Sequence, residues 1–378
     1  MGPIRIRDQS YIKQKNIESI LGVLEACQPI SRAEISRLTD MSPASITRIV
    51  NALLSLGLVS EGSVALSAGR GRRAINLRIR PDGMHTLGVC MESGRVRLGV
   101  MDFAGNLAAC QETRLPAPPA SPEEAANVAR TLFASLGPAS QWPSLAAVGV
   151  SVPGMVDNES GHVSRSDELG WTDVSLTQPF AQAFGLPAWA ENDVKACLVG
   201  ERAVRGIPEE EDVAYLLVGT GLGLAISAGG RILRGAGNAA GEIHGLPFGD
   251  GTLSDYLVER NLLRRARETA PAVRSLEDIV HACEQGADWA VTLMDSALAA
   301  MRVALYNIQA FAKPHHILLG GSLVGALAPV LRERLDGANL WFGQDYAEAC
   351  VTGAAILSQR QARRQLIARA VTEIVPED

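Results

Sequence analysis

The sequence predicts an α/β protein in which a small winged helical module, residues 1–80, precedes a larger α/β body, residues 81–378. Residues 1–80 contain twelve Lys and Arg against six Asp and Glu, whereas the rest of the chain contains 23 against 35. This asymmetry indicates that the small module contacts nucleic acid and that the body has another task. Strand-like and helix-like segments alternate along the body, which favours a sheet covered by helices.

The module begins with two predicted helices. The first has an apolar stripe formed by Ile17, Ile20, Leu21 and Leu24. The second begins at Ser31, whose side chain can cap the free backbone amides, while Glu34 reaches back three residues later as a capping box. We expect this second helix to direct Ile35 and Leu38 into the core.

A third helix begins at Ser42 and Pro43, a favourable N-cap and first helical residue, and ends near Gly57. Its core-facing residues are Ile46, Ile49, Val50 and Leu53. The residues left on its other face are Ala44, Ser45, Thr47, Arg48 and Asn51. Short polar groups beside one arginine suit a helix that enters a DNA major groove, so Ser45, Thr47, Arg48 and Asn51 are the predicted DNA contacts.

A half-buried strand, with apolar Ile75, Leu77 and Ile79 at alternate positions on its buried face, follows the third helix and a basic loop. The arginines at the tip of this loop, here called the wing arginines, are Arg70, Arg72 and Arg73. Three helices and a basic hairpin form a winged helix-turn-helix, and we expect the wing arginines to contact DNA phosphates. The alternative is a small helical domain with a solvated charged loop.

In the body, three segments predict buried strands that end in glycine turns: 145–154, 213–227 and 315–324. Two further short strands flank a turn within 87–106. The segments with helical character are 122–136, 254–268 and 288–312. Small molecules bind such sheets at the carboxyl ends of the strands, where the glycine turns fall.

Six motifs of the body resemble, in order and approximate spacing, those of the ROK family of repressors and sugar kinases. They are "GVSVPGMVD", "LGWTDVSL", "ENDVKA", "VGTGLG", "GNAAGEI" and "ILLGGSL". The resemblance covers nearly the whole chain, including "LSAGRGRR" before the body. It implies a two-lobed, actin-like ATPase (ribonuclease H-like) body behind the winged helix-turn-helix.

The turn in 87–106 departs from the family's kinase members, which resemble D-x-G-G-T-K there. The aspartate of that motif helps to hold magnesium, and its glycines admit the transferred phosphate. This chain has Cys90 at the aspartate, followed by Glu92, Ser93, Gly94 and Arg95. A second phosphate turn retains Gly219, Thr220, Gly221 and Gly223, but Leu224 and Ala225 replace further family glycines. We therefore expect a vestigial ATP site, no cofactor and no kinase activity.

The sugar-binding residues implied by the resemblance are better retained. They are Gly154, Asn192, Asp193, Glu242 and His244. Asp193 matches the general base of kinase members, and in a non-catalytic relative it would be a vestigial base that accepts a hydrogen bond from a sugar hydroxyl. The alternative is a set of surface carboxylates in loops.

Other departures bear on metal and sugar. His244 and Gly245 stand in the reverse of the family's order, and the cysteine-rich zinc segment is replaced by "GLPFGDGTLSDY", with Thr252 and Ser254 at family ligand positions. We therefore expect no metal, because no thiolates are available. Loss of the second family glutamate, and Glu168 where asparagine is common, leave the sugar unspecified. The six scattered cysteines are predicted to be buried reduced thiols.

The predicted function is a DNA-binding transcriptional regulator, a repressor, controlled by a sugar or polyol effector in the body. An active ATP-dependent sugar kinase with a DNA-binding arm is the alternative, and a body that binds another protein, such as a transport component, stays open. We expect a homodimer or higher homo-oligomer on a palindromic double-stranded DNA operator. No apolar run approaches the roughly 20 residues that cross a bilayer, so no membrane partner and a cytoplasmic location are expected.

Overall fold

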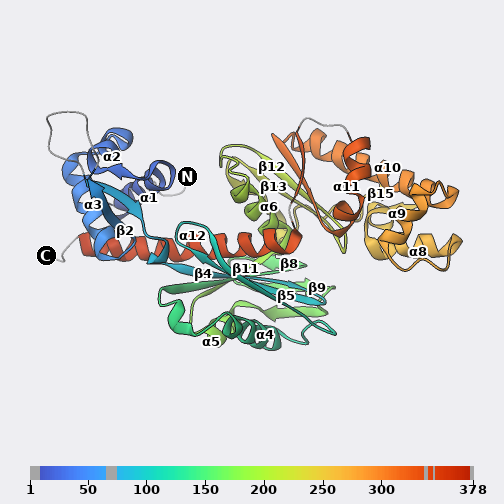
Figure 1. Cartoon of the computed structure of the whole chain (residues 1–378), viewed down its shortest axis with the longest axis horizontal. Coiled ribbons are helices and arrows are strands. Elements are labelled where there is room, and N and C mark those ends of the chain that lie inside the picture. The colour runs from blue at the N-terminus through green and yellow to red at the C-terminus, as the bar shows by residue number, and fades with distance from the viewer. Residues whose placement is uncertain (1–8, 65–74, 336–338, 344, 375–378) are drawn as a thin grey trace, which may run out of the picture.

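The computed structural model describes residues 9–64, 75–335, 339–343 and 345–374. Figure 1 shows a small N-terminal module at one end of the molecule and two lobes beyond it, with the red helix α12 extending from the module toward the lobes. The module contains helices α1 (Gln9–Cys27), α2 (Arg32–Thr39) and α3 (Pro43–Ser55). Its antiparallel sheet has the order β1 (Ile30–Ser31), β3 (Ile75–Ile79), β2 (Val59–Val64).

The local signals in the module confirm most of the predicted elements. Ser31 and Glu34 form the capping box of α2, and the Ser42 side chain caps α3 with Pro43 at its first position. Two burial predictions were wrong: Leu38 is 54 % exposed and Ile75 is 42 % exposed. Leu38 lies on the solvent face of α2, whose buried side chain is Ile35, and Ile75 begins β3 at its exposed end. The wing arginines Arg70, Arg72 and Arg73 lie outside the described residues.

The first lobe is built on a five-stranded sheet of order β11-β7-β4-β5-β6. Strands β4 (His85–Glu92), β7 (Leu145–Val152) and β11 (Ala188–Asn192) run parallel to one another. Strand β5 (Arg95–Asp102) runs antiparallel to both of its neighbours, β4 and β6 (Leu107–Arg114). Helices α4 (Pro122–Ser135) and α5 (Thr177–Phe184) cover one face around an apolar core. A small antiparallel sheet follows β7 and consists of β8 (Met155–Asp157), β9 (His162–Ser166) and β10 (Trp171–Ser175).

The second lobe repeats this pattern with the order β14-β13-β12-β17-β18. Strands β12 (Val213–Val218), β17 (His316–Gly320) and β18 (Leu340–Phe342) run parallel to one another. Strand β13 (Leu222–Ala228) runs antiparallel to both of its neighbours, β12 and β14 (Arg231–Ile232). Its helices are α7 (Leu253–Leu257), α8 (Glu259–Thr269), α9 (Leu276–Glu284), α10 (Asp288–Phe311) and α11 (Ser322–Arg334), with the β15–β16 hairpin (Pro247–Phe248, Gly251–Thr252) before α7. The single helix predicted over 254–268 is therefore two helices, because Val258 takes an extended conformation between them.

Two helices meet between the lobes. Helix α6 (Asp193–Val204) packs against β12 and β13, and α12 (Tyr346–Ile374) packs against β4, β5 and β7 and against α6. Glycines make this approach possible: a Cβ added at Gly353 would lie 1.8 Å from the Ala196 carbonyl oxygen, and one at Gly88 would lie 2.0 Å from the Val351 carbonyl oxygen. A larger residue at either position would clash with backbone, so the contact of α12 with α6 requires Gly353 and its contact with β4 requires Gly88.

The far part of α12 belongs to the core of the N-terminal module. Ala362 and Ile367 are buried in one apolar cluster with the inward residues of α1 and α3, and Arg363 forms an ion pair with Glu25 of α1. Figure 1 shows this end of α12 beside α3. One continuous helix thus contacts both the module and α6.

Two remaining sequence predictions concern cysteines and membrane spans. All six cysteines are free, but only Cys90, Cys197 and Cys350 are buried, so the prediction of burial was wrong for the other three. In the described part of the chain, every helix is too short or too polar to cross a bilayer.

Candidate functional site

The first candidate site is the outer face of α3. Thr47, Arg48 and Asn51 are exposed and Ser45 is partly exposed, as a contact surface requires. The Ser45 backbone amide donates to the Ser42 hydroxyl at 3.2 Å, so the cap of the helix lies on this same face. The structure therefore leaves all four predicted DNA contacts of α3 outside the buried core of the module.

One contributor to this face was missed from the sequence. Arg32, at the start of α2, donates to the Asn51 side-chain oxygen at 3.4 Å and pairs with Glu61 of β2 at 2.7 Å. Arg32 therefore links α2, α3 and β2. No sequence motif marked Arg32, because its partners lie 19 and 29 positions away.

The second candidate site begins where β11 runs into α6. Asn192 caps α6 by accepting from the Lys195 backbone amide at 3.1 Å. Its side-chain amide donates to the Gly154 carbonyl oxygen at 3.0 Å and to the Asp193 carboxylate at 2.8 Å. Gly154 has a φ of +113°, and a Cβ there would lie 2.3 Å from the Arg165 carbonyl oxygen, so this turn requires glycine. Gly154, Asn192 and Asp193 therefore form one hydrogen-bonded group.

Asp193 is the buried acceptor of this group. It is the first residue of α6 and is only 4 % exposed. Besides Asn192, its carboxylate accepts a hydrogen bond from the Tyr346 hydroxyl at 2.7 Å. Burial raises the pKa of Asp193 to about 7, although the Tyr346 hydrogen bond acts in the opposite direction. The carboxyl is thus close to its titration midpoint at neutral pH and can accept a hydrogen bond from a hydroxyl.

Glu242 and His244 lie together on the loop that follows the 3₁₀ helix η3 (Ala236–Asn238). Both side chains are about half exposed, and His244 Nδ1 lies 3.1 Å from Glu242 Oε2. Lys195 connects this loop to α6, because its Nζ donates to the Asn238 carbonyl oxygen at 2.6 Å. Burial lowers the pKa of Lys195, while the negative charges of Glu191, Glu242 and Asp193 oppose this effect. The loop and the head of α6 are therefore electrostatically coupled.

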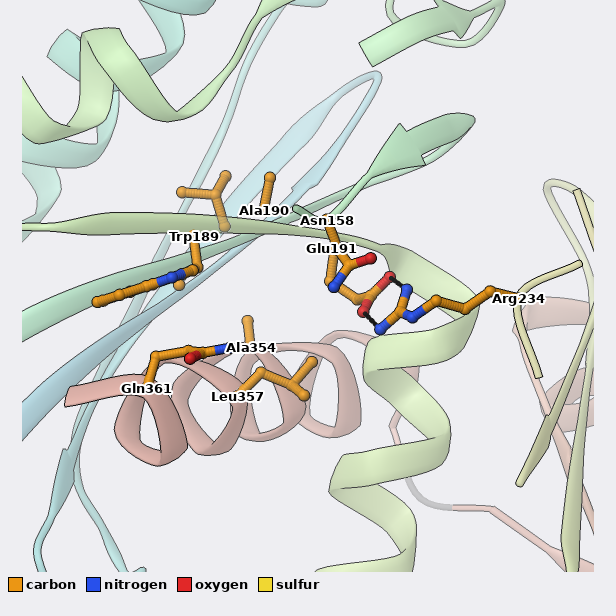
Figure 2. Close-up of a pocket in the computed structure, with 10 residues that line it drawn as sticks. Asn158, Trp189, Ala190, Glu191, Arg234, Ala354, Leu357 and Gln361 are labelled. Carbon is orange, nitrogen blue, oxygen red and sulfur yellow. Dashed lines mark hydrogen bonds and ion pairs between the residues drawn. The ribbon is translucent and has the colours of Figure 1, made fainter. Parts of the chain in front are cut away.

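A second tether joins the segment just before η3 to the first lobe. Arg234 forms a two-pronged pair with Glu191, the residue before Asn192, with N–O distances of 2.7 and 3.1 Å. Figure 2 shows this pair at the edge of a cavity of about 90 Å³ between β11 and α12, with Asn158 and Gln361 also on its wall. Only 5 % of the Glu191 side chain is exposed. The sequence analysis missed Arg234, which no motif marks.

The turn between β4 and β5 is occupied by the protein's own charges. Arg95 pairs with Glu92 at 2.9 Å, and the Ser93 backbone amide donates to the Glu168 carboxylate at 3.0 Å. Burial raises the pKa of Glu92 to about 7, partly offset by Arg95. Glu92 and Arg95 line a cavity of about 450 Å³ that also contacts Thr220.

Cys90 lies behind this turn and is 1 % exposed. Burial raises the pKa of its thiol well above the ordinary range, so it stays protonated. Within the described residues, no group of three or more His, Cys, Asp or Glu side chains is arranged to hold a metal ion. The second predicted phosphate turn, with Gly219 and Gly223, connects β12 to β13 and is held by the Glu259 amide, which donates to the Gly219 carbonyl oxygen at 2.8 Å.

Comparisons with known proteins agree with this arrangement. A sequence profile described as the ROK family matches residues 86–338, and one described as winged helix-turn-helix DNA-binding matches residues 14–60. The xylose repressor of Bacillus subtilis strain 168 is 22 % identical over 339 residues, which cover 86 % of this chain and 87 % of that protein.

Two solved structures share the fold. A ROK family transcriptional regulator, a homologue of the E. coli Mlc protein, superposes with a TM-score of 0.76 at 21 % identity and covers 96 % of this chain and 99 % of its own. A ROK family glucokinase from Streptomyces griseus, in complex with glucose and AMPPNP, superposes with a TM-score of 0.60 at 22 % identity. It covers 73 % of this chain and 99 % of its own.

Proposed function

Because this chain belongs to the ROK family and carries a winged helix-turn-helix, we propose that it is a transcriptional repressor whose body binds a sugar or polyol effector. Residues 1–80 are the proposed DNA-binding module and residues 81–378 the proposed effector-binding body. The repressor works as a homodimer on a palindromic operator, since a two-fold pair of modules doubles the contacts of one. Its place of action is the cytoplasm, where bacterial-type operators are found.

The DNA contacts in this proposal come from the exposed face of α3 and from the wing arginines. Arg48 and Asn51 can reach base edges, and Ser45 and Thr47 can reach phosphates or bases. Arg48→Ala separates these roles. If Arg48 reads a base, sequence preference relaxes at one position of the site, and if it contacts only phosphate, affinity falls about equally on all sequences. Fluorescence anisotropy on sites selected from random DNA measures both.

The effector contacts in this proposal come from Gly154, Asn192, Asp193, Glu242 and His244. Carboxylate acceptors beside an amide suit a ligand with several hydroxyl groups. D-xylose is the first sugar to test, since the similar Bacillus subtilis protein is named a xylose repressor. A thermal-shift panel of D-xylose, D-glucose, xylitol and glucose 6-phosphate tests the class, because a ligand that binds the folded state raises the melting temperature.

The observation that carries a regulatory rather than a catalytic role is the occupied turn at 92–95. The Glu92–Arg95 pair and the Ser93–Glu168 hydrogen bond lie in the turn that, by the family resemblance, would hold phosphate and metal in a kinase, and they support this proposal. We expect no sugar-dependent ATP hydrolysis above background, and Cys90→Asp alone does not restore it, because the neighbouring glycines are still absent. Turnover on the order of 1 per second with any sugar of the panel would overturn this role.

A sugar kinase with a DNA-binding arm is the second candidate. Asp193 favours it, because a carboxyl with a pKa of about 7 is matched to general-base work near neutral pH. Asp193→Ala separates the two functions. In a repressor, the variant keeps its effector-free DNA affinity and loses its response to the sugar, and in a kinase it loses turnover. A variant that responds to sugar at the wild-type concentration places Asp193 outside the effector site.

A further inference from the structure

The Tyr346–Asp193 hydrogen bond joins two elements that come from opposite sides of the interlobe contact. Tyr346 is the first residue of α12, which packs on the sheet of the first lobe, and Asp193 is the first residue of α6, which packs on the sheet of the second. Their side-chain oxygens lie 2.7 Å apart. With Asn192 on the other carboxylate oxygen, Asp193 already has a donor on each oxygen before any ligand binds.

The phenol also reaches the cavity beside the 92–95 turn. Tyr346 lines the same cavity of about 450 Å³ as Glu92 and Arg95. Tyr346 therefore lines that cavity and also contacts the Asp193 carboxylate. A phenol hydroxyl and a sugar hydroxyl are the same kind of donor to a carboxylate. Tyr346 thus makes, within the chain, the contact that an effector hydroxyl would make.

We propose that Tyr346 is an internal competitor for the effector at Asp193, and that an effector hydroxyl replaces its phenol there. This inference rests on the proposed function, since it names how the effector site of the repressor is regulated. Binding must then break the Tyr346 contact, so the residue lowers effector affinity and sets the concentration at which the repressor responds.

Helix α12 gives this exchange a route to the DNA-binding module. It has 29 residues, hence a length of about 44 Å, and its first turn holds Tyr346 while its later turns enter the module's apolar core. Arg363 pairs with Glu25 of α1, and Gln359 donates to the Asp102 carbonyl oxygen at 2.7 Å. We therefore expect a change at the first turn of α12 to alter the contacts of the helix with the module.

The first experiment needs no sugar. Tyr346→Phe removes the hydroxyl and keeps the ring, and Tyr306→Phe, whose residue on α10 is 74 % exposed, is the matched control. Hydrogen–deuterium exchange of the full-length proteins should be about tenfold faster at amides 347–351 in Tyr346→Phe, with a smaller increase at 17–27, and unchanged in the control. If Tyr346→Phe exchanges at the wild-type rate at 347–351, the Tyr346 hydroxyl does not restrain the start of α12. If its exchange is at the wild-type rate only at 17–27, the change does not reach the module along α12.

The second experiment titrates D-xylose, D-glucose, xylitol and glucose 6-phosphate into each protein by calorimetry at pH 8. We expect Tyr346→Phe to have about tenfold higher affinity than wild type for the sugar that wild type binds. The control should bind that sugar with wild-type affinity. Equal or weaker binding by Tyr346→Phe overturns the competition and leaves the proposed function standing. If none of the four compounds binds wild type or Tyr346→Phe, the proposed sugar effector is overturned together with the competition, whereas the exchange result still decides whether Tyr346 restrains α12.

Discussion

Replacing Asp193 with Asn tests whether the buried carboxyl at the head of α6 weakens the fold at neutral pH. Burial raises the pKa of Asp193 from an ordinary value of 3.8 to about 7. Because the folded pKa lies above the unfolded one, the free energy of unfolding falls as pH rises from about 4 to about 7 and changes little above that. A tenfold change in an ionisation constant corresponds to about 1.4 kcal/mol, so the full loss is about 4 kcal/mol.

Asn keeps both contacts of Asp193 but does not ionise. Its carbonyl oxygen can accept from Asn192, and its amide can donate to the Tyr346 oxygen. The advantage of the variant over wild type should therefore grow by about 2.5 kcal/mol between pH 5 and pH 8. Thermal melting across this range measures the growth as a Tm difference that widens by several degrees.

The titration of Glu92 does not affect the difference in Tm between the two proteins. Burial also raises its pKa to about 7, so it titrates in both proteins and cancels in the comparison. A Tm difference that stays constant from pH 5 to pH 8 would refute the reasoning, because the gain would then come from packing and not from the removed ionisation. A difference that narrows as pH rises would reverse the assigned direction of the pKa shift.

Three further outcomes are expected. Replacing the wing arginines with alanine should weaken operator binding and flatten its salt dependence by about one unit of slope per lost phosphate contact, so an unchanged slope in anisotropy titrations contradicts the wing assignment. Gly353→Ala should lower the free energy of unfolding by about 1–3 kcal/mol or more through the clash with the Ala196 carbonyl oxygen, whereas Gly22→Ala, with open space at its Cβ, should not, as urea unfolding would report. Arg234→Ala should cost about 3–5 kcal/mol by leaving Glu191 buried without its partner, and equal melting of variant and wild type would contradict that assignment.

The predicted class of fold is confirmed: an N-terminal winged helix-turn-helix precedes a two-lobed, actin-like ROK body. The module was predictable because capping and apolar stripes involve residues only a few positions apart. The Ser31–Glu34 box and the Ser42 cap formed as expected. The predicted burial of Leu38 and Ile75 was wrong because periodicity identifies the apolar face of an element but not which residues at its edge are exposed to solvent.

In the body, six motifs in the order of the ROK family were enough to predict the two lobes. The resemblance to the ROK family also implied that Asn192 and Asp193 bind the effector, and this role stays a prediction. The sequence predicted an altered phosphate turn at Cys90, since the residue types at that turn are a local property. It could not show that Glu92 and Arg95 pair with each other or that Glu168, far along the chain, accepts from the Ser93 amide.

Sequence by itself therefore determined the module and the buried strands of the body that end in glycine turns, because these depend on local patterns. Only the tertiary structure decided that Tyr346 meets Asp193, that Arg234 meets Glu191 and that the end of α12 enters the core of the module. These contacts join residues from 43 to more than 300 positions apart. The Tyr346–Asp193 contact lies where α12 crosses α6, and there glycines let the two backbones pack closely, a steric fit that no local pattern records.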